Sequence, residues 1–199
     1  MLAFFVRFCR EPPLILQRLL QCIFVWGRPA SKGNPQKAQL IVVQTASDCE
    51  GGVASVTNIA LADLAERYHK KFGTPIFPQA EAERILQGRG VVSVGTTLIY
   101  STVPLLSEKY GNGSLGIAES QQQFCAERGW TKVLVLAYYP HAWRVIWIYE
   151  RMGLEVIIPK DLPKMHPQAN MSQWRHRRAV TSYLFELAAR LFFLYKGYI

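Results

Sequence analysis

Apolar runs and amphipathic segments alternate along the middle of the chain. Gln39–Gln44 (QLIVVQ) and Thr131–Tyr138 (TKVLVLAY) are almost continuously apolar, which is typical of strands that are buried on both faces. Shorter runs of the same character, at 74–77, 91–94 and 154–158, are further strand candidates. The pattern therefore predicts a sheet whose strands lie mostly away from water.

Segments with helical spacing of apolar residues separate these runs, and capping or breaking residues mark their ends. The predicted helices run from Thr57 or Asn58 to Lys71, over 79–87, from Ser114 to Arg128, and from Pro140 to Met152. Proline at the first turn favours the start of the last of these helices. Residues 96–113 follow no pattern, because Pro104, Gly111 and Gly113 interrupt it.

Strands that alternate with helices predict an α/β domain with a parallel sheet and helices on both faces, which is a three-layer Rossmann-like fold. We expect one domain over 39–199, in which a C-terminal helix at 173–196 packs on the rest. Glu186 falls on the apolar stripe of that helix and needs a cationic partner. Ligands of such folds bind beyond the carboxyl ends of the strands.

The basic character of the chain lies at its two ends. The formal net charge is +9, of which residues 1–38 and 159–199 hold +5 each and the middle −1. This distribution disfavours nucleic-acid binding, for which a basic central cleft is more usual. Basic ends rich in Leu, Phe and Trp suit an anionic membrane surface or an acidic protein partner.

Residues 1–38 are predicted to be a basic, amphipathic extension that ends in a linker of Pro, Gly and Lys at 28–38. The stretch Leu14–Gly27 is too short to span a bilayer, and it lacks the order of a secretory signal. Two interpretations stay open, a helix at a membrane interface and a helix packed on the domain. A cytoplasmic protein is expected, either free or peripheral on the membrane.

Cysteine and histidine spacing indicates neither disulfides nor a metal. Cys9, Cys22, Cys49 and Cys125 form no C-x-x-C pair, which favours free thiols in a reducing compartment. The four histidines have no metal-ligand spacing, so no metal site is predicted, and no particular cofactor is indicated.

The start of the helix at Pro140 carries the strongest candidate chemistry. His141 and Arg144 are three residues apart and therefore share one face beside the free N–H groups of the first turn. Arginine offers a fork for phosphate or carboxylate, and histidine can transfer a proton near neutral pH. In a purely structural alternative, His141 caps a turn and Arg144 pairs with a carboxylate on a neighbouring helix.

The segment strand-His141-Ala142-Trp143-Arg144-helix, followed by Gly153-Leu154-Glu155-Val156, resembles the hallmark of the DUF218 family. Glu81-Ala82 and the C-terminal helix with Glu186 are also similar to features of that family, and the resemblance covers about 39–199. Ser114 and Glu119 lie near the position of its Thr-x-Glu-Asn motif. The family has a glycine-rich loop after its first strand. The corresponding loop of this chain, Thr45–Gly52, differs from it, because its glycines come late and two acids are added.

The resemblance implies a Rossmann-like fold and a link with cell-envelope or lipid-carrier metabolism. We expect an anionic, phosphate-bearing small molecule at the carboxyl edge of the sheet, held by Arg144, with His141 as the candidate acid or base. Further candidate ligand-binding residues are Asp48, Glu81, Ser114 and Glu119.

Whether such a site is catalytic stays open. The alternative function is a non-catalytic protein that kept the fold and contacts a membrane surface or a protein partner through Trp26, Trp174 and the basic cluster 175–178. A dinucleotide enzyme is disfavoured, because no G-x-G-x-x-G follows the first strand.

Overall fold

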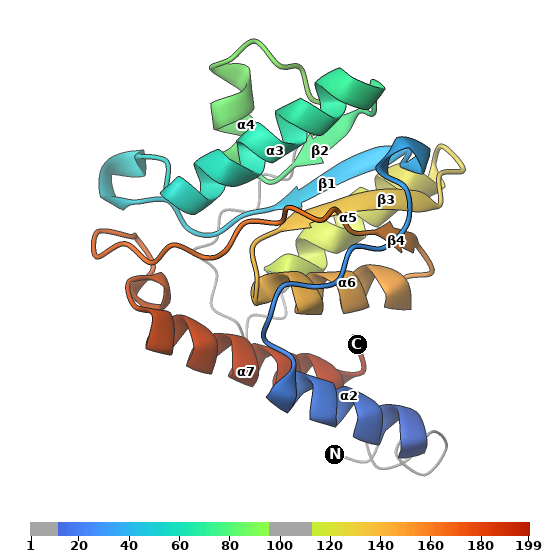
Figure 1. Ribbon diagram of the computed structural model, residues 1–199, viewed down its shortest axis with the longest axis vertical. Coiled ribbons are helices and arrows are strands. Elements are labelled where there is room, and N and C mark those ends of the chain that lie inside the picture. The colour runs from blue at the N-terminus through green and yellow to red at the C-terminus, as the bar shows by residue number, and fades with distance from the viewer. Residues whose placement is uncertain (1–11, 96–112) are drawn as a thin grey trace.

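A four-stranded, all-parallel sheet forms the centre of the protein in a computed structural model that describes residues 12–95 and 113–199 (Figure 1). The strands are β1 (Leu40–Gln44), β2 (Ile76–Pro78), β3 (Lys132–Ala137) and β4 (Glu155–Ile157), in the order β2-β1-β3-β4. The central strands β1 and β3 pair from Leu40 opposite Val133 to Gln44 opposite Ala137. Both are buried, as their apolar runs predict.

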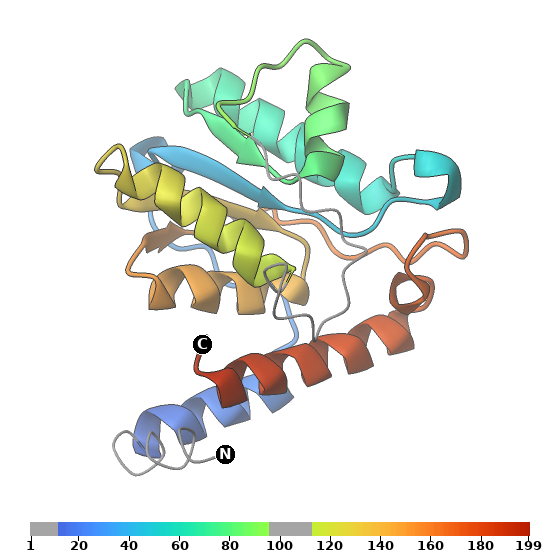
Figure 2. The ribbon, with the colours of Figure 1, turned by 180° about the vertical axis from the view of Figure 1, so that it is seen from behind.

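The helices cover both faces of the sheet, which confirms the three-layer α/β prediction. They are α2 (Pro12–Phe24), α3 (Val56–Phe72), α4 (Ala80–Gln87), α5 (Ser114–Ala126), α6 (His141–Arg151) and α7 (Ala179–Lys196), with short 3-10 turns η1 (Pro35–Lys37), η2 (Glu50–Gly52) and η4 (Trp174–His176). The chain passes from β1 to β2 on one side of β1. It then crosses back over β1 to β3 on the other side and continues in that direction to β4. Right-handed crossovers then place α3 on one face and α5 and α6 on the opposite face (Figure 1, Figure 2).

The reversal of direction between β1 and β3 has a functional consequence. The loops that follow these two neighbouring strands turn away to opposite faces, which leaves a crevice at the carboxyl edge of the sheet. Helix α7 lies beyond α6, and α2 lies beside α7 (Figure 1, Figure 2).

One predicted strand is wrong, because the described residues Val91–Val94 form no strand. The N–H of Val91 returns to the carbonyl of Leu86 in a turn, and only the N–H of Val94 bonds a strand residue, Ile76. Glycines at 88 and 90 turn the chain here, and Val92 is left exposed.

Several predicted boundaries shift by a few residues. Ser55, not Thr57 or Asn58, caps α3, because its side chain accepts the N–H of Asn58 at 3.3 Å. The Tyr139–Pro140 bond is cis, and Pro140 takes the N-cap position, so that α6 begins at His141. The predicted helix at 173–196 is divided into η4 and α7, since Arg178 is extended. Most of 96–113, for which no prediction was possible, lies outside the described residues.

The segment 28–38 runs along the domain, although its composition is that of a linker. Lys32 exchanges two backbone hydrogen bonds with Ile158, at 3.0 and 2.9 Å, and its ammonium lies 2.9 Å from Glu150. Arg28 donates to the carbonyl of Lys160. Strand β4 is therefore flanked by this segment at its outer edge.

Candidate functional site

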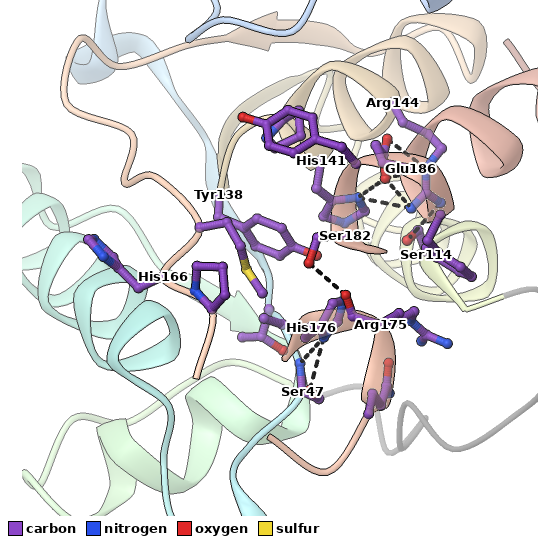
Figure 3. A pocket seen from close by; sticks show the side chains of 18 of the residues that line it. Ser47, Ser114, Tyr138, His141, Arg144, His166, Arg175, His176, Ser182 and Glu186 are labelled. Carbon is purple, nitrogen blue, oxygen red and sulfur yellow. Dashed lines mark hydrogen bonds and ion pairs between the residues drawn. The ribbon is translucent and has the colours of Figure 1, made fainter. Parts of the chain in front are cut away.

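A pocket of about 380 Å³ lies at the carboxyl edge of the sheet, at the crevice between β1 and β3 (Figure 3). The loop after β1 contributes Ser47, and the segment after β3 contributes Tyr138 and His141. The remaining walls come from the start of α5, from the segment after β4 and from α7, and Gln79 after β2 also lines the cavity. The position agrees with the expectation for a parallel α/β sheet.

Glu186 of α7 is the centre of a buried charge network on the inner wall of this pocket. Its carboxylate accepts hydrogen bonds from Nε and Nη2 of Arg144, at 3.1 and 3.0 Å, and from Nε of Arg190 at 3.2 Å. Glu186 is only 4% exposed. Burial alone would raise its pKa, but the charge of the neighbouring Arg144 holds this pKa well below the usual range. The predicted need for a cationic partner is thus confirmed.

Arg144 is mostly committed to the protein. It also donates through Nη1 to Oγ of Ser114, at 3.2 Å, and through Nη2 to Nδ1 of His141, at 3.0 Å. Within the described residues, four of its five N–H groups are used, which leaves one on Nη1 for a ligand. The ion pair anticipated by the structural alternative is present, and Arg144 still lines the pocket.

His141 presents a neutral imidazole to the pocket. Burial and the charge of Arg144 lower its pKa, and Glu186 opposes them. Because a guanidinium only donates, Nδ1 is the acceptor of the 3.0 Å bond and the proton resides on Nε2. The Nδ1–Glu186 contact of 3.5 Å is longer and does not change this assignment.

His176, in η4, is a second oriented imidazole. Its Nδ1 accepts the backbone N–H of Ser47 at 3.2 Å and lies 2.9 Å from the Ser47 hydroxyl, so its proton is also on Nε2 (Figure 3). Burial, helped by the charge of Arg175, lowers its pKa to about 3. Ser47 is completely buried and therefore acts as an anchor for the ring.

Arg175 is a partly buried cation of the pocket wall that retains capacity for a ligand. Its guanidinium lies 4.2 Å from the centre of the Phe185 ring, and within residues 12–95 and 113–199 its buried Nε has no hydrogen-bond partner. Burial lowers its pKa, because a charged form without a counter-ion is disfavoured there. An anion in the pocket would supply the missing partner.

The other cation of the lining is Lys164, which is exposed on the segment after β4. The described residues of the wall include three cations, Arg144, Lys164 and Arg175, and a single acid, Glu186. The carboxylate oxygens of Glu186 are already bonded to arginines. Helices α5 and α6 also begin at the pocket, at Ser114 and His141, and their first turns add positive partial charge. The cavity therefore favours an anion.

Of the sequence-predicted site residues, the structure brings His141, Arg144 and Ser114 together in the pocket wall. Asp48, in the loop after β1, and Glu81, in α4, do not line the pocket. Asp48 pairs with Arg84 and accepts from Asn58 at 2.8 Å, and Glu81 accepts the hydroxyl proton of Thr45 at 3.0 Å. Both shape the loop that lines the pocket. Glu119 is exposed on α5 and does not line it.

Sequence reasoning missed the contributions of Ser47, Tyr138, Lys164, Arg175 and His176. Arg175 and His176 were interpreted only as part of a basic cluster. A usable signal existed, because the segment after a fourth parallel strand must leave the sheet at the same edge as the loops after β1 and β3.

Comparisons of the chain with protein-family models, with curated proteins and with solved structures found no match. The resemblance to the DUF218 family therefore stays a prediction. Within the described ranges, no group of His, Cys, Asp or Glu could hold a metal ion, and none of the helices described is long and apolar enough to cross a membrane. Cys22, Cys49 and Cys125 are buried and free.

Proposed function

We propose that the pocket binds an anionic, phosphate-bearing small molecule. The observation that carries this proposal is the charge of the wall, with three cations and one acid that is already bonded to two buried arginines. A neutral ligand would leave Arg175 without a counter-charge, whereas a phosphate would accept from it.

Each polar side chain of the pocket has a specific role in this proposal. Arg175 and Lys164 hold the anion, and the remaining N–H of Arg144 reaches the same space. The Nε2–H groups of His141 and His176 are additional donors, and His141 is the candidate acid or base. Apolar wall residues such as Ile117, Tyr138 and Phe185 suit a ligand with an apolar body as well as a phosphate. The DUF218-like pattern would place such a ligand in cell-envelope or lipid-carrier metabolism.

Binding of defined probes tests the proposal. We would titrate inorganic phosphate, nucleoside monophosphates and short prenyl phosphates into the parent protein, into Arg175→Gln and into Arg151→Gln, with calorimetry and thermal shift as readouts. Arg151 is exposed on α6 away from the pocket and is a matched control. Loss of one charge-assisted hydrogen bond should weaken binding about 10- to 100-fold in Arg175→Gln, and Arg151→Gln should bind like the parent.

Two results would refute the proposal. One is the absence of binding for every phosphate probe. The other is a probe that binds Arg175→Gln and the parent equally, because the ligand would then lie elsewhere on the protein.

A further inference from the structure

Helices α2 and α7 form an antiparallel pair on the outside of the molecule (Figure 1, Figure 2). Trp26, just after α2, contacts Tyr183 near the start of α7 with ring centres 5.3 Å apart. Arg190, further along α7, donates to the carbonyl of Val25 at 2.6 Å. The inner side of α7 faces the pocket and α6 through Glu186 and Arg190, so its opposite side points away from the domain.

That opposite side is apolar along its length. The exposed residues of α7 that follow helical spacing are Val180, Leu184, Ala188, Leu191 and Tyr195, and its two end residues, Ala179 and Lys196, are exposed as well. Val180 and Leu184 are 69% and 62% exposed, and on α2 Phe24 is 74% exposed. Leu16, Leu20 and Ile23 of α2 are also exposed, at the same type of spacing. We call these apolar residues of the two helices the α2/α7 face.

Within the described residues, neither helix of this face carries an exposed acid. Neither Pro12–Phe24 nor Ala179–Lys196 contains an acid other than Glu186, which is buried. Exposed Arg178 precedes α7 and Lys196 ends it, whereas the neighbouring Arg177 is paired with Glu50 at 2.7 Å. Two copies of the chain that met through this face would bring these cations together, whereas an anionic bilayer would complement them.

We propose that the α2/α7 face docks on the surface of an anionic lipid bilayer. The two helices lie in the plane of the interface with their apolar stripes among the acyl chains, and the basic residues at the ends of α7 contact the headgroups. Trp174 and Tyr195 stand near the two ends of α7 with exposed rings, a position in which aromatic side chains favour the interface. This inference concerns a surface and does not depend on what the pocket binds.

Sedimentation of the full chain with vesicles tests the docking. We would use vesicles of phosphatidylcholine alone and of phosphatidylcholine mixed with phosphatidylglycerol, at low and at high salt. We expect binding to the mixed vesicles that weakens as salt increases, and little binding to phosphatidylcholine alone. Failure of the mixed vesicles to bind the chain, or equal binding to both kinds of vesicle, would overturn the proposal.

Matched substitutions localise the contact. Val180→Ser combined with Leu184→Ser removes two residues of the face, and Val53→Ser combined with Ile59→Ser removes two exposed apolar residues from η2–α3. We expect the first pair to lower the partition coefficient about tenfold or more and the second to leave it unchanged. Phe24→Ser gives an independent variant on α2.

The replaced side chains are exposed, so each variant should melt like the parent protein. Equal losses for the two pairs would overturn the assignment of the face. Sedimentation equilibrium of the parent gives a second test. A parent dimer that dissociates in the variant with Val180→Ser and Leu184→Ser would also overturn the proposal, because a second copy of the chain would then cover the same residues.

Discussion

Replacement of Glu186 by glutamine should destabilise the protein more than any other single loss of charge. The change keeps the shape of the side chain and removes its negative charge from between Arg144 and Arg190, of which Arg190 is fully buried. Two buried guanidinium groups then lack a counter-charge. Removal of one partner from a buried ion pair costs about 3–5 kcal/mol of unfolding free energy.

Urea unfolding measures this loss, and Glu150→Gln is the matched control. Glu150 also contacts two cations, Arg18 at 3.6 Å and Lys32 at 2.9 Å, but it is partly exposed, and its substitution should cost less than about 1 kcal/mol. Equal effects of the two substitutions would refute the reasoning, because they would show that water screens the Glu186 network.

The pH dependence provides a second check on the same variant. The pKa of Glu186 is depressed in the folded protein, so its stabilising effect is complete above the ordinary glutamate pKa and declines as the pH falls below it. The difference in stability between the parent and Glu186→Gln should therefore shrink on acidification. A difference that stays constant down to strongly acidic pH would contradict this assignment.

Three further substitutions test the structure around the site. His176→Asn keeps an acceptor for the Ser47 N–H. Because the folded ring has a pKa of about 3 against an ordinary 6.5, the unfolding free energy of the parent should fall by up to about 5 kcal/mol as the pH falls from the higher to the lower value. Urea melts across that pH range should show a smaller loss for the variant. Gly95→Ala should cost about 1–3 kcal/mol, because the new Cβ would lie 2.6 Å from the Phe77 ring, whereas Gly27→Ala, with open space around it, should be neutral in the same melts. Ser55→Ala removes the cap of α3 and should lower the unfolding free energy by about 1 kcal/mol; an unchanged value would show that the 3.3 Å bond contributes nothing.

The parts of the fold that sequence predicted well are those in which local pattern and burial agree. The runs at 39–44 and 131–138 are long and apolar, and they became the buried central strands. The run at 91–94 has the same composition, but turn-forming glycines precede it and only one of its N–H groups bonds the sheet, so composition alone misled. Strand formation there depended on a pairing partner that sequence does not reveal.

The candidate site divides in the same way. A helix start within a residue of Pro140 and the need of Glu186 for a cation follow from local chemistry, and both were predictable. The role of Arg175 depends on where the segment after β4 folds back, which is a tertiary property. A cluster of basic residues in a sequence does not show which member faces a cavity and which faces solvent.

The bonds of Arg190 have a consequence for how this protein can be divided. Its guanidinium joins Glu186 on α7, the carbonyl of Pro140 at the start of α6, and the carbonyl of Val25 beyond α2. The N-terminal extension therefore supplies an acceptor to the most buried cation of the domain. Composition suggests a natural boundary at residue 39. A fragment that began there would lack Val25, so one N–H group of Arg190 would lose its hydrogen-bond acceptor. The extension is best regarded as a part of the domain that cannot be detached, and any shortened version of the protein should begin before α2.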